Sequence, residues 1–196
     1  MKPAPTTTSP IATPLYHSPV RYDPFRHKRR SIRLRGYDYS SPGAYFITIC
    51  AHGHESLFGT VTDGRLILNG YGKIVRECWY DLPRHYPHVT IDAFVVMPNH
   101  VHGVIVLLAE AIGAVGAGLK PAPTTTERRR QALPEVVRGF KTFSARRINT
   151  LRDAAGTSVW QRNYYEHIVR DDKDLERIRI YIADNPRHWE EDECHP

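Results

Sequence analysis

The stretch that most constrains the fold is VVMPNHVHGVIVLL, residues 95–108. Branched apolar residues on both sides of Pro98 and Asn99 predict two β-strands with a break between them. Alternate residues of a strand point to the same face of a sheet, so His100 and His102 are expected to project side by side. Buried strands are normally built from apolar residues, and this pair of imidazoles therefore needs a chemical explanation.

The hydrophobic periodicity around this hairpin predicts a complete domain. Strands are expected over 43–52, 64–69, 89–98, 100–108 and 159–170, and helices over 70–87, 133–154 and 171–186. The resulting order, ββαββαβα, predicts an α+β fold of the ferredoxin-like sandwich type. We expect a largely antiparallel sheet with the helices on one face.

Composition divides the 196 residues into one domain with flanking segments. Residues 1–33 are rich in proline and end in basic residues, which predicts an extended basic arm, either a solvated tail or a segment that contacts phosphates. The domain itself is expected over 34–190, interrupted by a Gly-, Ala-, Pro- and Thr-rich flexible insertion at 109–131. Residues 191–196 are expected to be a tail.

One heptapeptide, KPAPTTT, occurs at 2–8 and again at 120–126. Two flexible linkers of similar composition would explain it. Residues 116–123 also permit a DNA spelling that is a near-perfect palindrome. Our hypothesis is that residues 116–126 are a translated palindromic element, which the codons of the gene can test.

The charge balance favours a polyanionic partner. Lysine and arginine number 27 against 21 acidic residues, a net charge of +6, and nucleic acid is the first candidate. The three cysteines include no CxxC pair, which fits a reducing, cytoplasmic compartment. The N-terminus has no apolar run typical of a signal peptide, and 94–108 is too short and polar to cross a membrane.

Basic residues gather on the polar side of the helix predicted over 133–154. They are Arg138, Lys141, Arg146 and Arg147. Such a row is usually a solvated surface, and the alternative is a set of phosphate contacts.

The histidine pair has a direct chemical interpretation. Neutral imidazole is the commonest metal ligand in proteins, and two on one strand face form a ready bidentate set. The alternative is two histidines with ordinary hydrogen bonds, because HxH alone is a weak signal. A metal site would need a third ligand, with further positions open to substrate.

Three motifs then carry a resemblance to a known family. They are MPNHVH (97–102), WQRNYYEH (160–167) and the final Y-I-x-x-N-P (181–186). In this order and spacing the chain, over about residues 30–190, resembles the REP-associated tyrosine transposases. These belong to the HUH single-strand endonuclease superfamily and are related to the single-tyrosine insertion-sequence transposases.

The resemblance implies an activity on DNA. The family cleaves and rejoins single-stranded DNA at palindromic hairpins through a 5′-phosphotyrosine intermediate, with a divalent cation (Mg²⁺ or Mn²⁺) on the histidine pair. No nucleotide cofactor is expected, since the covalent link conserves the phosphodiester energy. The likeness to the REP-associated branch further implies a monomer.

The same resemblance assigns the nucleophile to Tyr181, four residues before the Asn of the NP motif. Tyr181 and Asn185 share one helix face, so Asn185 would supply an amide oxygen as the third metal ligand. A tyrosine that merely fills the edge of the core is the alternative. Tyr164 and Tyr165 compete as nucleophiles, because they lie in the second motif.

Further residues receive weaker assignments. His167 orients a ligand or contacts DNA, or is a half-buried histidine without such a role, and Asn99 supports the turn before the pair. Trp160 and Arg162 would stack on or hydrogen-bond to a splayed base, although Trp160 fits a core position equally well.

Two alternatives to an active enzyme remain open at this point. One is a hairpin DNA-binding protein of the same fold without productive cleavage. The other is an unrelated metal-binding ferredoxin-like domain, which leaves the last helix unexplained.

Overall fold

The structure is a computed structural model that describes residues 34, 36–109, 131–192 and 194. The predicted arm (1–33), most of the predicted insertion (110–130) and both copies of KPAPTTT lie outside the described residues. Within the described residues, no helix combines the length and apolar character needed to cross a membrane.

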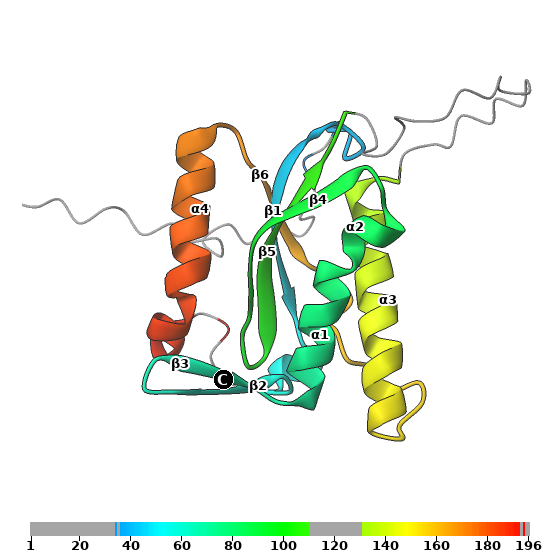
Figure 1. Ribbon diagram of the computed structural model, residues 1–196, viewed down its shortest axis with the longest axis vertical. Coiled ribbons are helices and arrows are strands. Elements are labelled where there is room, and N and C mark those ends of the chain that lie inside the picture. The colour runs from blue at the N-terminus through cyan, green and yellow to red at the C-terminus, as the bar shows by residue number, and fades with distance from the viewer. Residues whose placement is uncertain (1–33, 35, 110–130, 193, 195–196) are drawn as a thin grey trace, which may run out of the picture.

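A four-stranded antiparallel sheet forms the centre of the domain (Figure 1). Its order is β4-β5-β1-β6, and every neighbouring pair is antiparallel. The bounds are Gly43–Cys50 for β1, Val89–Val96 for β4, His100–Leu107 for β5 and Tyr165–Ile168 for β6. A separate hairpin consists of β2 (Gly59–Thr62) and β3 (Arg65–Leu68).

The predicted α+β, ferredoxin-like architecture is confirmed. Read across the sheet, the four strands are the second, third, first and fourth of the sheet strands in chain order. Helices connect β1 to β4 and β5 to β6, so each half of the domain is a split β-α-β unit. The long apolar runs of β1 and β5 occupy the two central positions, because these strands are covered on both faces.

Three helices cover one face of the sheet. They are α1 (Gly70–Tyr80), α2 (Leu82–His85) and α3 (Leu133–Leu151). The side chain of Asn69 caps α1 by accepting from the main-chain N–H groups of Tyr71 and Gly72. Buried apolar side chains of α1 and α3 meet alternate residues of β1 and β5 in the main core.

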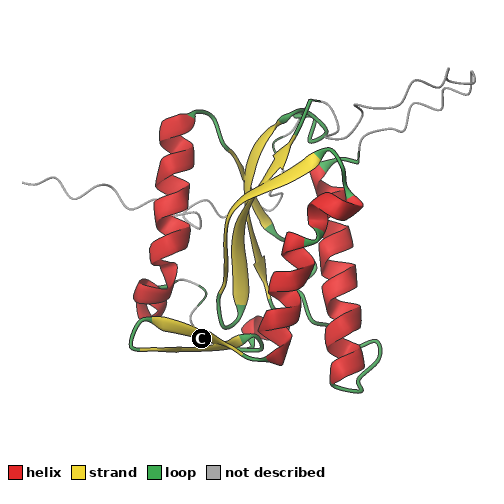
Figure 2. Cartoon of the chain, in the orientation of Figure 1, coloured by secondary structure: helices red, strands yellow, loops and turns green. Residues whose placement is uncertain are grey.

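The fourth helix corrects one part of the prediction, because α4 (Asp172–Asp184) lies on the opposite face (Figure 2). Phe46 and Val104 point away from the main core and form a second, smaller core with Ile178 and Ile182 of α4. The helices therefore do not share one face. A strand buried on both sides needs a cover on both sides, and α4 is the described helix that supplies the second.

Two predicted elements are divided or shortened in the structure. The helix expected over 70–87 is interrupted at Asp81, and α2 begins with Pro83 in its first turn. The strand expected over 159–170 is regular only in β6 and is preceded by an irregular segment from 157 to 164. Two 3₁₀ segments, η1 (His52–His54) and η2 (Asn185–Glu191), flank the ends of β1 and α4.

Candidate active site

A tight turn at Pro98 and Asn99 positions the histidine pair. The main-chain N–H of Met97 donates to the carbonyl of His100 at 2.8 Å, which closes the hairpin between β4 and β5. His100 and His102 are the first and third residues of β5, and both are completely buried. Their side chains lie on the α4 face, where the ring of His102 stacks on Phe46 with 5.6 Å between ring centroids.

The two imidazoles meet edge to edge. The Nε2 atoms of His100 and His102 are 2.8 Å apart. Burial lowers the pKa of both rings, and in His100 the nearby carboxylate of Asp192 offsets part of that shift. Both rings are therefore neutral near pH 7, which is the form that binds metal ions.

Asn99 determines which nitrogen of His100 carries the proton. Its amide nitrogen donates to the main-chain carbonyls of His54 and Cys194. The amide oxygen must then face Nδ1 of His100, at 2.8 Å, and accept its hydrogen. Nε2 of His100 consequently presents a lone pair to the site.

Thr48 provides the matching contact for the second ring. Its hydroxyl lies 2.8 Å from Nδ1 of His102 and can either accept or donate. When it donates, the Nε2–H of His102 donates in turn to Nε2 of His100 at 2.8 Å. When it accepts, both Nε2 atoms carry lone pairs that can bind one cation. This is the arrangement in which a partner of each ligating histidine fixes its tautomer.

Tyr181 reaches the pair from α4. Its hydroxyl is 3.2 Å from Nε2 of His102, and the two rings are 5.0 Å apart at their centroids. The ring also packs edge-on against Phe46. Ile178, Tyr181, Ile182 and Asn185 recur at helical spacing, so α4 presents the hydroxyl and the second core to the sheet together.

Asn185 lies one turn beyond Tyr181, and only 4% of its surface is exposed. Its amide nitrogen donates to a carboxylate oxygen of Asp192 at 3.1 Å. Its side-chain oxygen is buried and has no hydrogen-bond partner among the residues that the structure describes. A buried acceptor in that state costs stability unless a cation or water completes it.

Asp192 is a site residue that the sequence prediction missed. A carboxylate oxygen lies 3.9 Å from Nε2 of His100, and one ligand atom from each of His100, His102 and Asp192 falls within 4.8 Å of the others. The predicted boundary at 190 placed this residue in the tail. Its only sequence signal is an acidic run shortly after the NP motif.

These donors fit a divalent cation. Two imidazole nitrogens with an amide oxygen, or with a carboxylate oxygen, suit several divalent metals, Mg²⁺ and Mn²⁺ among them. The buried oxygen of Asn185, to which none of the described residues donates a hydrogen bond, is the observation that favours such an ion.

Other predicted residues lie away from this cluster. His167 bonds through Nε2 to Asp174 at 2.8 Å, at the opposite end of α4 from Tyr181. Burial alone would raise the pKa of Asp174, but hydrogen bonds from His167 and from the main-chain N–H of Arg170 outweigh it and lower the pKa. The interpretation of His167 as a half-buried structural histidine therefore fits its surroundings.

The competing tyrosines fall on different faces. Tyr165 of β6 packs against Phe46 on the α4 face, whereas Tyr164 packs against the main core. Of the two, Tyr165 is therefore the one that shares the second core with Tyr181.

Trp160 does not present its ring to solvent, which corrects its assignment as a base-stacking residue. Only 7% of it is exposed, its ring packs against Phe58 and Phe140, and its N–H donates to Ser144 at 2.9 Å. A ring packed this closely against core side chains leaves little surface for a nucleobase.

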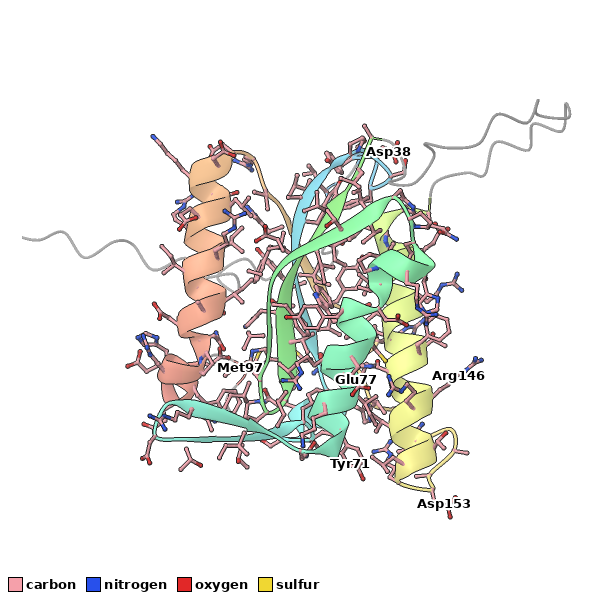
Figure 3. The ribbon with its side chains drawn as sticks, in the orientation of Figure 1. Asp38, Tyr71, Glu77, Met97, Arg146 and Asp153 are labelled. Carbon is pink, nitrogen blue, oxygen red and sulfur yellow. The ribbon has the colours of Figure 1, made fainter. Side chains whose placement is uncertain are left out.

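The basic residues of α3 lie on the sheet face opposite the histidine pair. Arg138 and Arg146 are exposed, and Arg146 projects away from the helix (Figure 3). Arg147 instead pairs with Glu77 of α1 at 2.6 Å. These residues therefore cannot contact the same phosphate as the histidines.

A cavity of about 660 Å³ separates α3 from the irregular segment, and its lining includes Arg138, Lys141 and Arg162. The ammonium group of Lys141 donates to the main-chain carbonyls of Gln161 and Arg162. The irregular segment also bonds to the end of β1, because the N–H of Gln161 donates to the carbonyl of Cys50. Cys50 pairs with His100 across the sheet, so the irregular segment reaches the same end of the sheet as the histidine pair.

Comparison with known proteins supplies independent information. No protein-family model matches the chain. A Haemophilus influenzae protein, described only as uncharacterized, is 42% identical over 181 residues, which cover 90% of this chain and 98% of that protein. A second protein of that organism bears the name "Putative REP-associated tyrosine transposase" and is 29% identical over 149 residues, 76% of this chain and 73% of that protein.

Among solved structures, the fold is similar to that of a REP-associated tyrosine transposase bound to a REP hairpin. The TM-score is 0.51 at 20% sequence identity, over 80% of this chain and 73% of the other. At that identity the likeness shows a shared fold.

Proposed function

We propose that this chain, which is similar in sequence to a protein named as a REP-associated tyrosine transposase and in fold to another, cleaves and rejoins single-stranded DNA at palindromic, REP-like hairpins. The observation that carries the proposal is the 3.2 Å contact between the hydroxyl of Tyr181 and Nε2 of His102. It brings a potential nucleophile to a pair of neutral, buried imidazoles.

In the proposed reaction the hydroxyl of Tyr181 attacks a phosphorus of the DNA backbone. The bond from its oxygen to phosphorus forms, and the bond from phosphorus to the 3′ oxygen breaks. The phenol gives up its proton, and the departing 3′ oxygen takes one up. The products are a 5′-phosphotyrosyl DNA and a free 3′-hydroxyl, which reverse the step on rejoining without a nucleotide cofactor.

His100 and His102, with the side-chain oxygen of Asn185, would hold a divalent cation, Mg²⁺ or Mn²⁺. Bound there, the cation stabilises negative charge on the phosphate oxygens. Asn99 and Thr48 hold the two rings with their Nε2 atoms toward the site. Asp192 offers a second oxygen donor at the same place.

Exposed basic residues would guide the DNA to this site. The protein would act as a monomer that binds one hairpin. Arg138, Arg146 and Arg162 are exposed, and Lys141 lies in the cavity wall between them. Contacts of this kind to phosphates are independent of sequence and weaken with salt.

The test uses the full chain with a single-stranded oligonucleotide that contains a hairpin, in Mn²⁺ or Mg²⁺. We expect a covalent protein–DNA adduct that survives denaturing electrophoresis. Tyr181→Phe should abolish the adduct and leave hairpin binding nearly unchanged, whereas Tyr165→Phe, on the same face of the sheet, should still form it.

Two outcomes would contradict the proposal. An adduct that persists in Tyr181→Phe and disappears in Tyr165→Phe moves the nucleophile to β6. Tight hairpin binding with no adduct under any metal condition favours a hairpin-binding protein without cleavage.

A further inference from the structure

A second group of metal-binding side chains lies beside the histidine pair. Cys50 stands at the end of β1, His54 follows in η1, and Cys194 comes from the C-terminal segment. One ligand atom from each falls within 4.8 Å of the other two. None of the three has a part in the proposed cleavage reaction.

The spacing of the two thiols matches a tetrahedral zinc site. Their sulfur atoms are 3.8 Å apart. Two Zn–S bonds of ~2.3 Å at the tetrahedral angle hold their sulfurs about 3.8 Å apart, whereas a disulfide requires ~2.05 Å. Thiolates with imidazole are ligands that select zinc over Mg²⁺ or Mn²⁺.

The backbone that leads from Cys50 to His54 turns sharply, and the turn brings His54 near the two cysteines. Gly53 and His54 both adopt positive φ, 65° and 58°. Positive φ is uncommon for a residue with a side chain and marks a position that its surroundings hold in place. The ring of His54 is exposed, so it can rotate toward the two sulfurs.

Asn99 links this group to the histidine pair. Its amide nitrogen donates to the main-chain carbonyls of two of the three residues, His54 and Cys194, while its oxygen orients His100. The N–H of Cys194 also donates to Asp192 at 2.7 Å. An ion bound by the three side chains would therefore fasten the C-terminal segment against the pair.

We propose that Cys50, His54 and Cys194 bind a zinc ion that anchors the C-terminal segment beside the histidine pair. The described residues supply three donors, and water can take the fourth position of the tetrahedron. The proposed zinc site is separate from the cation site of the cleavage reaction, and the zinc proposal does not depend on that reaction.

Co²⁺ is the probe, because thiolate ligands give it an intense near-ultraviolet charge-transfer absorption that nitrogen and oxygen ligands do not. The full chain, reduced and stripped of metal, should develop this band at one equivalent of Co²⁺, and one equivalent of Zn²⁺ should remove it. Cys50→Ser and Cys194→Ser should lose the band, and His54→Ala should weaken Co²⁺ binding at least tenfold. Two controls should keep it: Cys78→Ser, which removes the remaining cysteine, and the double variant His100→Ala with His102→Ala.

The wild-type titration tests the site without any substitution. Absence of the band in the folded wild-type chain overturns the proposal. A band that Cys78→Ser abolishes, or that Cys50→Ser and Cys194→Ser both retain while circular dichroism shows them folded, overturns it as well.

Discussion

The side-chain oxygen of Asn99 accepts the Nδ1 hydrogen of His100, and this contact leaves a lone pair on Nε2 of His100, which faces Nε2 of His102. The amide cannot turn over without placing its oxygen against the carbonyls of His54 and Cys194. A side-chain amide one residue before the start of β5 thus sets the chemistry of a buried ring.

Replacing Asn99 should therefore weaken metal binding. We expect Asn99→Ala to reduce Mn²⁺ affinity by about 10–100-fold, since the tautomer and orientation of His100 are no longer held. Calorimetric titration with Mn²⁺ measures this. Asn149→Ala, which removes an amide bonded to Thr157 instead, is the control, and equal Mn²⁺ affinities in the two variants would contradict the role of Asn99.

Acid should destabilise the protein through the histidine pair. Burial lowers the pKa of both rings below that of a histidine in the unfolded chain. At pH values between the folded and the unfolded pKa, the unfolded chain therefore binds more protons than the folded protein. Their contribution to stability is complete above pH ~6.5 and is lost as pH falls toward the folded pKa values. From pH 7 to 5.5 this amounts to about 1 kcal/mol for each histidine.

Urea unfolding at the two pH values, in a metal chelator, measures this difference. The double variant His100→Asn with His102→Asn should show a smaller loss between pH 7 and 5.5. An equal loss in the variant would assign the acid sensitivity to other groups.

Trp160 should matter for stability and little for DNA binding. We expect Trp160→Ala to lower the free energy of unfolding by about 3–5 kcal/mol, because it empties a site between Phe58 and Phe140. Trp160→Phe should cost less and leave hairpin affinity of the folded protein unchanged. A tenfold weaker affinity in a stable Trp160→Phe protein would restore the base-stacking assignment.

The exposed arginines of α3 should act through salt-dependent contacts. We expect Arg138→Ala and Arg146→Ala each to weaken hairpin binding for every sequence tested and to reduce the slope of log affinity against log salt by about 0.7–0.9. Fluorescence anisotropy at several salt concentrations gives the slope. Arg84→Ala, an exposed arginine paired with Asp81, is the control, and unchanged slopes in the α3 variants would mean that α3 does not contact the DNA.

Much of the fold followed from local patterns. The alternation of residues along 100–107 placed His100 and His102 on one face, and helical spacing placed Tyr181 and Asn185 together, because both are properties of a single element. The order of strands and helices along the chain also restricted the topology to a few arrangements.

The position of α4 required the tertiary structure. The apolar run of β1 shows that both its faces are buried, but not which helix covers which face. Packing assigned α4 to the face with Phe46, and that same choice brought Tyr181 to His102 and left the basic side of α3 on the other face.

The sequence by itself determined most of the secondary structure of the core, the paired imidazoles and the resemblance to the REP-associated tyrosine transposases. The tertiary structure alone decided that Asp192 and Cys194 belong beside the pair and that Trp160 belongs to the core. The physical reason is the distance along the sequence over which each kind of information acts. Periodicity reports neighbours within one element, whereas a contact such as that between Asn99 and Cys194 joins residues 95 positions apart. Such contacts depend on how whole elements pack, which no local pattern records.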